Sequence, residues 1–327
     1  MTAALRNQLL WCTTGMNLNP LEYFNIFRPF VHYFNTRKMN RYLHKELDER
    51  YETVQGNGEK RSELGKSVID LALKAYLEEN TDGSAVHAGK LDRDFKDFVV
   101  GQIKLFIFAG HDTTSAAAVF TYSLLSQHPA VLARVREEHN NVFGVDFAEV
   151  GSTLASSPAL LDRLVFTLAV IKESLRIYPT VAAIREGQSD FFLHDGQRQS
   201  YPTKDCVVWG DHYAVHHNPA HWPQPEEFLP ERWLVPEGDP LYPPKHAWRP
   251  FEKGPRNCIG QELALTEVKV MLALTNREFE ITDAYEEFDK LKNKPKGANV
   301  NGQRAYMMLR GGGHPADHYP CKVKYAG

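Results

Sequence analysis

The sequence lacks several features that would define a protein class by composition. Its 327 residues contain only four cysteines, Cys12, Cys206, Cys258 and Cys321, which are widely scattered and form no CxxC pair. This spacing excludes a dense disulfide framework, disfavours a structural zinc site and fits a reducing, cytosol-facing setting. The formal net charge is only −3, so the composition does not indicate a nucleic-acid binder.

Long apolar runs, internal repeats and low-complexity tracts are also missing. No stretch of about 18 apolar residues occurs, so the sequence predicts no transmembrane helix. Its first twenty residues lack the charged start and apolar run of a signal peptide. The length suits one large domain or two ordinary ones, and no convincing linker divides the chain, so we predict a single domain over residues 1–327.

Helical patterns dominate the sequence. The longest candidate, Asp92–Gln127, is apolar on all sides over its later part, which predicts a buried helix. A second apolar stripe with a 3.6-residue period runs from Leu161 to Leu175. It must end near Tyr178, because Pro179 follows and disfavours helical backbone before it. Gln261–Asn276 is a third clear helix.

Extended segments are short and lie in the second half. The stretch from Arg185 to Val208 contains FFLHDG and CVVWG, which are typical of small hairpins. Tyr306–Val323 predicts a terminal hairpin around Gly311, Gly312 and Gly313. The predicted fold class is therefore mainly α with a small β region.

The segment FEKGPRNCIG, Phe251–Gly260, places a cysteine on a glycine-bounded loop that enters a helix. Gly254 and Gly260 permit backbone conformations and close approaches that a Cβ would block. The following helix directs its N-terminal dipole at Cys258, which favours a thiolate. Taken alone, this cysteine is more often a small buried residue, and the surrounding pattern is what favours a ligand.

Two further motifs have unusual chemistry. AGHDTT, Ala109–Thr114, puts an acid and an alcohol inside an apolar helix, where each must be satisfied and where the threonine can bend the helix. The alternative is a simple threonine bend beside a solvated Asp112. ESLR places Glu173 and Arg176 on one helix face, which by itself is usually a surface ion pair of little worth.

Together these motifs resemble the cytochrome P450 family. FEKGPRNCIG matches the family's heme-binding loop, FxxGxRxCxG, at every fixed position, and AGHDTT, ESLR and PERW (Pro230–Trp233) stand in the family's order. The stretches DHYAVHHNPAHWPQPEEFLPERWL and RPFEKGPRNCIGQELALTEVKVMLA are similar to fungal secondary-metabolite members, in particular those acting on polyketides in mycotoxin pathways. The resemblance runs from the middle of the chain to its end.

The resemblance implies a heme b cofactor with Cys258 as the iron ligand. A thiolate on heme iron favours cleavage of the O–O bond. Arg256 and Arg185 are expected at the propionates, and Phe251 near the sulfur. The cofactor-binding set so implied is Phe251, Gly254, Arg256, Cys258, Gly260, Arg185 and Ala109.

The resemblance also assigns catalytic and structural roles. Asp112 and Thr113 become the acid–alcohol pair that delivers protons, and Ala109 leaves room over the porphyrin. Glu173 and Arg176 become a buried pair joined by Arg232 of PERW, which holds the coil before the cysteine loop. Val181, Ala182 and Ala183 are expected to border the substrate.

The implied activity is that of a monooxygenase. It inserts one oxygen atom from O2 into an apolar organic substrate, with electrons from NADPH through a reductase, at the cytosolic face of the endoplasmic reticulum membrane. Lys253, Arg134 and Arg136 are candidate contacts for an acidic reductase, although a solvated surface explains them as well. Four histidines, His216, His217, His221 and His246, have no spacing typical of a zinc site.

Two other functions remain open. The family's N-terminal anchor and early helices do not precede Met1, so we expect a chain that lacks its N-terminal part. It would be either a monooxygenase domain or a non-catalytic fragment that binds heme poorly. A heme-thiolate isomerase or dehydratase without dioxygen chemistry is disfavoured by the intact pair of Asp112 and Thr113.

Overall fold

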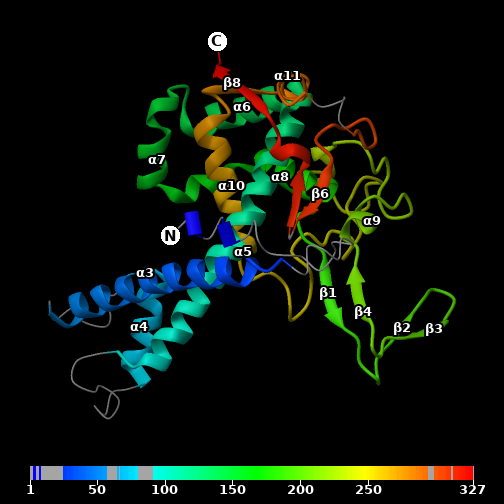
Figure 1. Cartoon of the computed structure of the whole chain (residues 1–327). Helices are drawn as coiled ribbons and strands as arrows, with labels where there is room; N and C mark the ends of the chain where they lie inside the picture. Colours follow the sequence, from blue (N-terminus) through cyan, green and yellow to red (C-terminus); the bar gives the residue numbers. More distant parts are fainter. Residues whose placement is uncertain are drawn as a thin grey trace. The chain divides into compact units, whose positions relative to one another are not determined.

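The computed structural model describes residues 3–4, 7–8, 25–56, 65, 67–79, 91–293, 298–310 and 312–326. The chain forms two compact units, Met1–His111 and Asp112–Gly327, and the boundary falls within helix α5, Arg93–Gln127. Cys12 and Gly311 lie outside the described residues. Figure 1 labels the helices and strands in chain order.

The first unit is helical. It comprises α3 (Arg28–Gly56), α4 (Val68–Glu79) and the first half of α5. Its core is formed by apolar faces that meet around Leu47, Leu73 and Val100. An ion pair of 2.6 Å between Arg50 Nε and Asp70 Oδ1 joins α3 to α4.

The second unit contains most of the remaining helices. They are α6 (Pro129–Phe143), α7 (Val150–Ser156), α8 (Val165–Ile177), α9 (His212–His216), α10 (Gln261–Thr275) and α11 (Tyr285–Leu291), with short 3₁₀ turns at Phe147–Glu149, Pro158–Arg163, Pro230–Trp233 and Ala316–His318. α8 ends at Ile177, two residues before Pro179, as the sequence predicts. The stripe that begins at Leu161 is a 3₁₀ turn up to Arg163 before the α-helix starts.

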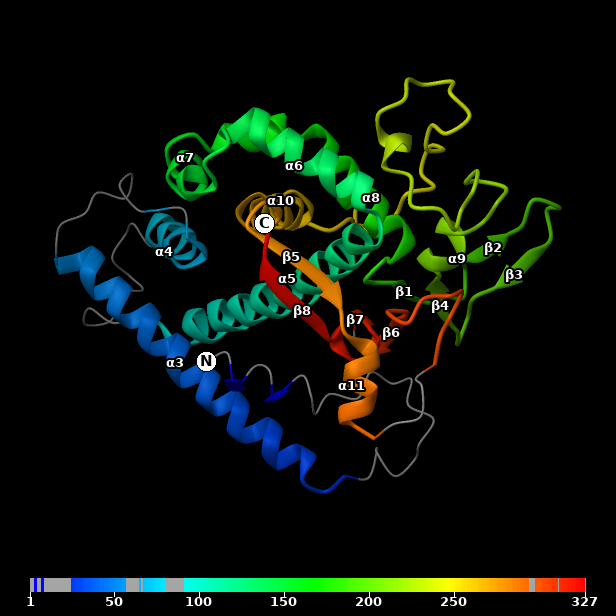
Figure 2. The ribbon, with the colours of Figure 1, turned by 90° about the horizontal axis from the view of Figure 1, so that it is seen from above.

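The described strands form four two-stranded antiparallel sheets. β1 (Ala183–Glu186) pairs with β4 (Val207–Gly210), β2 (Phe192–His194) with β3 (Ser200–Pro202), β5 (Phe279–Asp283) with β8 (Cys321–Tyr325), and β6 (Met307–Arg310) with β7 (Gly312–Pro315). The terminal hairpin is thus shorter than predicted. Cys321–Val323 pairs with β5 instead, as Figure 2 shows.

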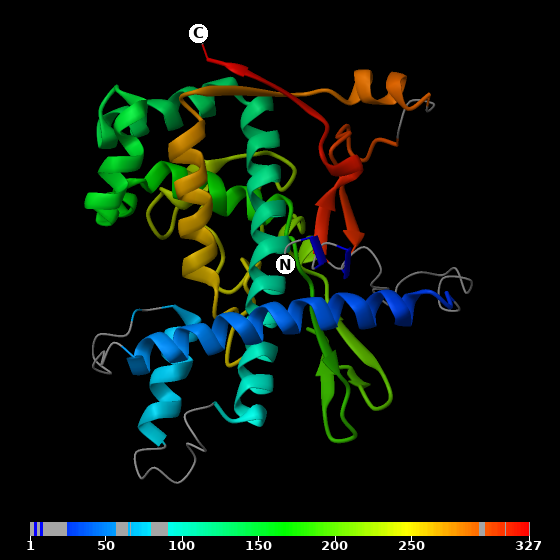
Figure 3. The same ribbon diagram turned by 60° about the vertical axis from the view of Figure 1, so that its left-hand side comes forward.

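The core of the second unit lies between α5, α8 and α10. Phe120 of α5, Ile171 of α8 and Leu272 of α10 belong to one buried cluster. Near the ends of α5 and α10, the hydroxyls of Tyr122 and Thr275 lie 2.6 Å apart, and both helices run in the same direction in Figure 3. The predicted fold class, mainly α with a small β region, is confirmed.

The helix α5 departs from the prediction of a fully buried helix. Phe106 is 48% exposed, and Leu105 and Phe108 are exposed as well. The apolar pattern therefore does not correspond to burial in this stretch. Among the helices that the structure describes, none combines the length and the apolar character needed to span a membrane.

Candidate active site

The cysteine loop, Phe251–Gly260, folds back on itself through its backbone. The Cys258 N–H donates to the Phe251 carbonyl at 2.8 Å, and the Asn257 N–H to the Gly254 carbonyl at 3.0 Å. Gly254 has φ +81°, a conformation that favours glycine. The loop therefore presents the Cys258 side chain on an exposed turn.

Gly260 leads from the cysteine loop into α10. Its φ of −87° suits any residue, and a Cβ there would lie 3.8 Å from Cys258 Sγ, an ordinary contact. Glycine at 260 is thus not required by the fold of the described chain, contrary to the expectation that a Cβ would clash. What the missing side chain provides is open space beside the sulfur.

Tryptophan side chains connect the cysteine loop to the core. The rings of Trp222, Trp233, Trp248 and Phe251 form a series with successive centroid distances of 6.1, 5.3 and 5.9 Å. The Trp248 indole N–H donates to the carbonyl of Lys172 on α8 at 3.1 Å. Phe251 accordingly packs toward this aromatic series, and its contacts hold the first residue of the loop.

The ESLR pair is fully buried. Glu173 and Arg176 are 0% exposed, and the guanidinium donates to both carboxylate oxygens, at 2.9 Å and 3.1 Å. The other Arg176 N–H groups donate to the carbonyl of His216, the last residue of α9, at 2.9 Å and to carbonyls of the coil that follows, including that of Pro225 at 2.7 Å. Arg176 therefore fixes this coil to α8.

Arg232 is the second cation on Glu173. It too is 0% exposed, and its Nε lies 3.1 Å from Glu173 Oε1. Burial lowers the pKa of Arg232, and the carboxylate of Glu173 opposes that shift. The Trp233 indole N–H adds a hydrogen bond of 3.1 Å to Glu173 Oε2. We call Glu173, Arg176, Arg232 and His216 the buried network.

His216 links the buried network to the cysteine loop. Its Nδ1 lies 3.0 Å from the carbonyl of Arg176, and its Nε2 accepts the backbone N–H of Arg249 at 2.9 Å. These partners require the tautomer with the proton on Nδ1. Burial lowers the pKa of His216 to about 3, so the ring stays neutral and can accept from Arg249, two residues before the loop.

The AGHDTT motif is helical throughout within α5. Ala109 and Gly110 are exposed, and a Cβ at Gly110 would meet no atom of the described residues within 4 Å. One hydroxyl that bonds back to the helix is that of Ser115, which donates to the Asp112 carbonyl at 2.9 Å. The Asp112 carboxylate instead contacts His314 of β7, with 3.1 Å between Oδ2 and Nε2.

The position of the cysteine loop relative to Asp112 follows from the helix geometry. α10 extends back from Thr275 for about 21 Å to Gln261, at 1.5 Å per residue. Asp112 lies about 15 Å before Tyr122 along the parallel α5. Since Tyr122 and Thr275 are in contact, the first two turns of α10 lie about level with Asp112. The cysteine loop, at the start of α10, thus lies about level with the acid of AGHDTT, which is in the middle of α5.

Arg185 and Arg256, the predicted propionate contacts, are both exposed. Arg185 lies on β1, and its Nη1 donates to the neighbouring carbonyl of Ile184 at 2.8 Å. Arg256 lies two residues before Cys258 on the cysteine loop. Their side chains are accessible to a ligand with carboxylates.

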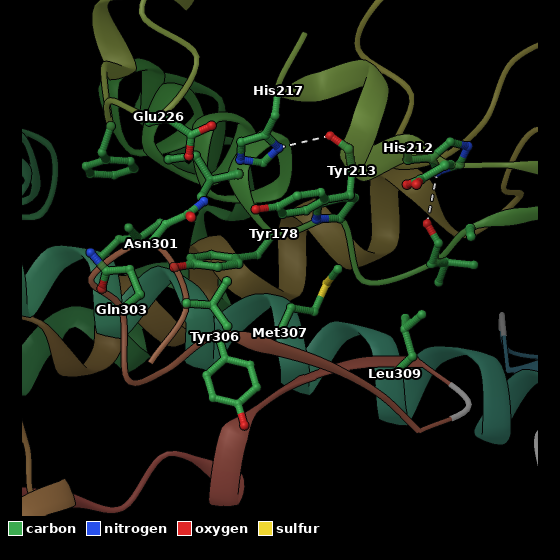
Figure 4. Close-up of a pocket in the computed structure, with 18 of the residues that line it drawn as sticks. Tyr178, His212, Tyr213, His217, Glu226, Asn301, Gln303, Tyr306, Met307 and Leu309 are labelled. Atoms are coloured by element: carbon green, nitrogen blue, oxygen red, sulfur yellow. Dashed lines mark hydrogen bonds between the residues drawn. The ribbon is translucent and has the colours of Figure 1, made fainter. Parts of the chain in front are cut away.

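A cavity of about 950 Å³ adjoins the strand entry. Val181 and Ala182, which were expected to border the substrate, line it together with Met307 and Leu309 of β6. Figure 4 shows Tyr178 and Tyr213 in its wall and His217 bonded to the carbonyl of Tyr213 at 2.9 Å. Sequence reasoning missed the contribution of β6, because no local pattern indicates which strand meets a distant segment.

The candidate docking cations differ in their surroundings. Lys253 is exposed, with Nζ 5.9 Å from the centre of the Trp248 ring. Arg134 pairs with Glu231 at 3.0 Å. Arg136 donates to the carbonyls of Asn276 and Phe279, at 2.7 and 3.3 Å, so it supports the fold and is not a free surface charge.

An exposed cysteine at the mouth of a helix and a long helix with an acid–alcohol motif are the features expected of a heme-thiolate site. The cytochrome P450 family model matches residues 8–309. The cytochrome P450 monooxygenase polC of Polytolypa hystricis is 50% identical over 325 residues, which is 99% of this chain and 57% of that protein. The chain belongs to the cytochrome P450 family.

A second fungal relative and a solved structure agree. The cytochrome P450 monooxygenase acrF of Aspergillus aculeatus is 33% identical over 319 residues, 90% of this chain and 62% of that protein. The crystal structure of the cytochrome P450DA heme domain matches with a TM-score of 0.69 and 23% identity, over 100% of this chain and 61% of that one. The chain therefore has the P450 fold, and it spans about three fifths of the length of these relatives.

The family implies heme, and the exposed residues around the cysteine fit that group. Sγ of Cys258 is accessible, and no side chain stands at Gly260 to cover it. Ile259 is 90% exposed and Leu263 on α10 is exposed, which offers apolar surface to a flat macrocycle. A cysteine sulfur, an apolar surface and exposed arginines are the groups that a heme with two carboxylates requires.

Proposed function

We propose that this chain is the heme-binding part of a monooxygenase that inserts one oxygen atom from O2 into an apolar secondary-metabolite substrate. The observation that carries the proposal is the exposed Cys258 on its glycine loop at the start of α10, about level with Asp112 of α5. A heme held there supplies dioxygen activation when its iron is bound by a thiolate.

The chain's own residues have distinct tasks in this proposal. Cys258 provides the sulfur ligand, with Phe251 and Gly254 shaping its loop and Gly260 leaving space beside it. Arg256 and Arg185 bind the heme carboxylates through charge-assisted hydrogen bonds. These assignments rest on the family motif and on the exposure of both arginines.

Asp112 and Thr113 hold and move protons on the oxygen side of the site. A carboxylate next to an alcohol in one helix turn can take a proton from water and pass another on through the hydroxyl. Ala109, one turn before Thr113, leaves room because its side chain is a single methyl group. Glu173, Arg176 and Arg232 support the coil that precedes the cysteine loop and take no part in the chemistry.

The partners and the location are further parts of the proposal. The electrons come from NADPH through a cytochrome P450 reductase, for which exposed Lys253 is a candidate contact. The complete protein works at the cytosolic face of the endoplasmic reticulum membrane. The support for these points is membership of the family together with the fungal relatives.

The substrate is proposed to be an apolar polyketide-type metabolite. Val181, Ala182, Met307 and Leu309 form an apolar part of the cavity wall and would contact it. The test of oxygen insertion uses 18O2, NADPH and a fungal reductase, with mass spectrometry of the products of a panel of such compounds. Incorporation of one labelled atom supports the proposal, and incorporation of none from the whole panel contradicts it.

A second candidate function is a non-catalytic chain that binds heme poorly. The exposed apolar side chains of α5, Leu105, Phe106 and Phe108, favour it, because such patches promote association between molecules. Heme addition followed by dithionite and carbon monoxide separates the two. A red-shifted, thiolate-type Soret band supports the monooxygenase, and failure to take up heme supports the second candidate.

A further inference from the structure

The hairpin of β6 and β7 ends against the acid of the AGHDTT motif. His314 of β7 and Asp112 of α5 are 202 residues apart in sequence, and Nε2 of the one lies 3.1 Å from Oδ2 of the other. Their side chains are 18% and 23% exposed, so water reaches both but the contact is largely covered. Neither the family motif nor any local pattern assigns this histidine a role.

Two glycines, Gly312 and Gly313, allow the hairpin of β6 and β7 to lie close to Asp112 and to the strand entry. The Gly313 N–H donates to the carbonyl of Thr180 at 2.6 Å, which fixes β7 to the strand entry. A Cβ at Gly313 would lie 2.6 Å from Met307 Sδ, and one at Gly312 would lie 3.2 Å from Asp112 Oδ2. The backbone of β7 therefore holds the His314 ring in a defined place beside Asp112.

We propose that His314 is a positioning residue for Asp112, which orients the carboxylate for proton delivery in the proposed monooxygenase. The ring N–H at Nε2 donates to Oδ2 and so fixes the rotation of the carboxylate. Oδ1 is then the oxygen that takes a proton from water and passes it toward Thr113. One proton enters at Oδ1 and one leaves through the Thr113 hydroxyl, so both side chains end unchanged.

The inference rests on the proposed function, but the contact can be tested without heme. In the chain labelled with 15N-histidine, we expect the His314 ring to carry its proton on Nε2 and to exchange it slowly. Asp112→Ala removes the acceptor and should abolish this preference, while the exposed ring of His221 keeps its spectrum. An unchanged His314 spectrum in Asp112→Ala would show that the contact does not form and would overturn the proposal.

The role is tested in the heme-loaded chain by product formed per NADPH consumed. His314→Ala should lower this ratio roughly tenfold, less than the 10²–10⁴ expected for loss of a general acid. Heme content and the thiolate-type band should not change. His314→Gln, whose amide N–H can replace Nε2–H, should restore part of the ratio, and His221→Ala is the matched control.

The outcomes distinguish the two proposals. If the chain takes up no heme, the proposed function fails, and the NMR comparison still decides whether His314 holds Asp112. If the wild-type chain turns over and His314→Ala gives the same product per NADPH, the positioning role is wrong while the monooxygenase stands. A loss that His314→Gln does not restore at all also contradicts a role for the ring N–H.

Discussion

The buried network and the cysteine loop are linked through the hydrogen bond from Arg249 to His216, and they differ in almost every physical respect. Glu173, Arg176 and Arg232 are completely buried, and each charge has ionic and backbone partners. The cysteine loop is mostly exposed and is held chiefly by its own backbone bonds and by the residues just before it. Polar contacts are therefore concentrated in the buried network, whereas the side chain of Cys258 is exposed.

This difference separates two kinds of variant. Changes in the buried network should affect folding first and heme only as a consequence. Changes in the cysteine loop should affect heme with little effect on folding, because exposed side chains contribute little to the free energy of unfolding. Two predictions test the contrast, and a third tests a buried histidine that lies outside both regions.

The largest effect is expected from Glu173→Ala. It leaves the guanidinium groups of Arg176 and Arg232 buried without their carboxylate, and breaking a buried pair in this way typically costs about 3–5 kcal/mol. We expect the free energy of unfolding in urea to fall by at least that amount, to the point of partial unfolding at 25 °C. Glu262→Ala, at an exposed position on α10, is the control. Equal stability of both variants would contradict the structural role of the network.

An intermediate effect is expected from pH, through a buried histidine that supports α8. His139 of α6 donates from Nε2 to the Thr167 hydroxyl at 2.9 Å, since that hydroxyl itself donates to Glu138. Burial lowers the pKa of His139 from 6.5 to about 4, and Arg277 adds to the shift. The folded ring stays neutral while the unfolded one takes up a proton, so stability is complete above pH 6.5 and is lost as the pH falls toward 4.

The pH effect can be isolated by substitution. Between pH 6.5 and 5 the contribution of His139 amounts to about 2 kcal/mol, at 1.36 kcal/mol per unit. His139→Gln keeps the donor but does not titrate, so its loss of unfolding free energy over this range should be smaller by about that amount. His194→Gln, at an exposed position on β2, should show the wild-type dependence. An identical slope for all three proteins would contradict the assignment.

The smallest effect on stability, with a clear effect on heme, is expected from Arg256→Ala. The side chain is exposed, so the free energy of unfolding should change by no more than about 0.5 kcal/mol. Loss of a charge-assisted contact to a propionate should weaken heme binding by roughly tenfold, measured by titration of the Soret band. Arg198→Ala, in the β2–β3 turn, is a matched exposed control. Unaltered heme affinity in Arg256→Ala would contradict the proposed contact between Arg256 and a heme carboxylate.

Local sequence signals predicted much of this architecture. The end of α8 before Pro179, the start of α6 at Pro129 and the bounds of α10 follow from proline and from apolar periodicity, which act over a few residues. The family motif likewise predicted the buried ESLR pair and its partner Arg232, while the role of Cys258 stays a prediction. These helix ends and motifs can be predicted without knowing which distant residues they contact.

Distant contacts were what the sequence could not reveal. The contact between His314 and Asp112 depends on a hairpin that returns after 202 residues, and no spacing rule covers that distance. The burial predicted for Phe106 and Phe108 was wrong, because an apolar pattern does not show which residues pack against it. The link from His216 to Arg249 was missed because the four histidines were considered only as metal ligands.

The most direct test of the account is the carbon monoxide spectrum of the reduced, heme-treated chain in a series of cysteine variants. Cys206, Cys258 and Cys321 are all exposed, so any of them could bind heme adventitiously. We expect Cys206→Ala and Cys321→Ala to keep the red-shifted thiolate band of the wild-type chain and Cys258→Ala to lose it. A band that persists in Cys258→Ala would show that another group binds the iron and would contradict the assignment of the ligand.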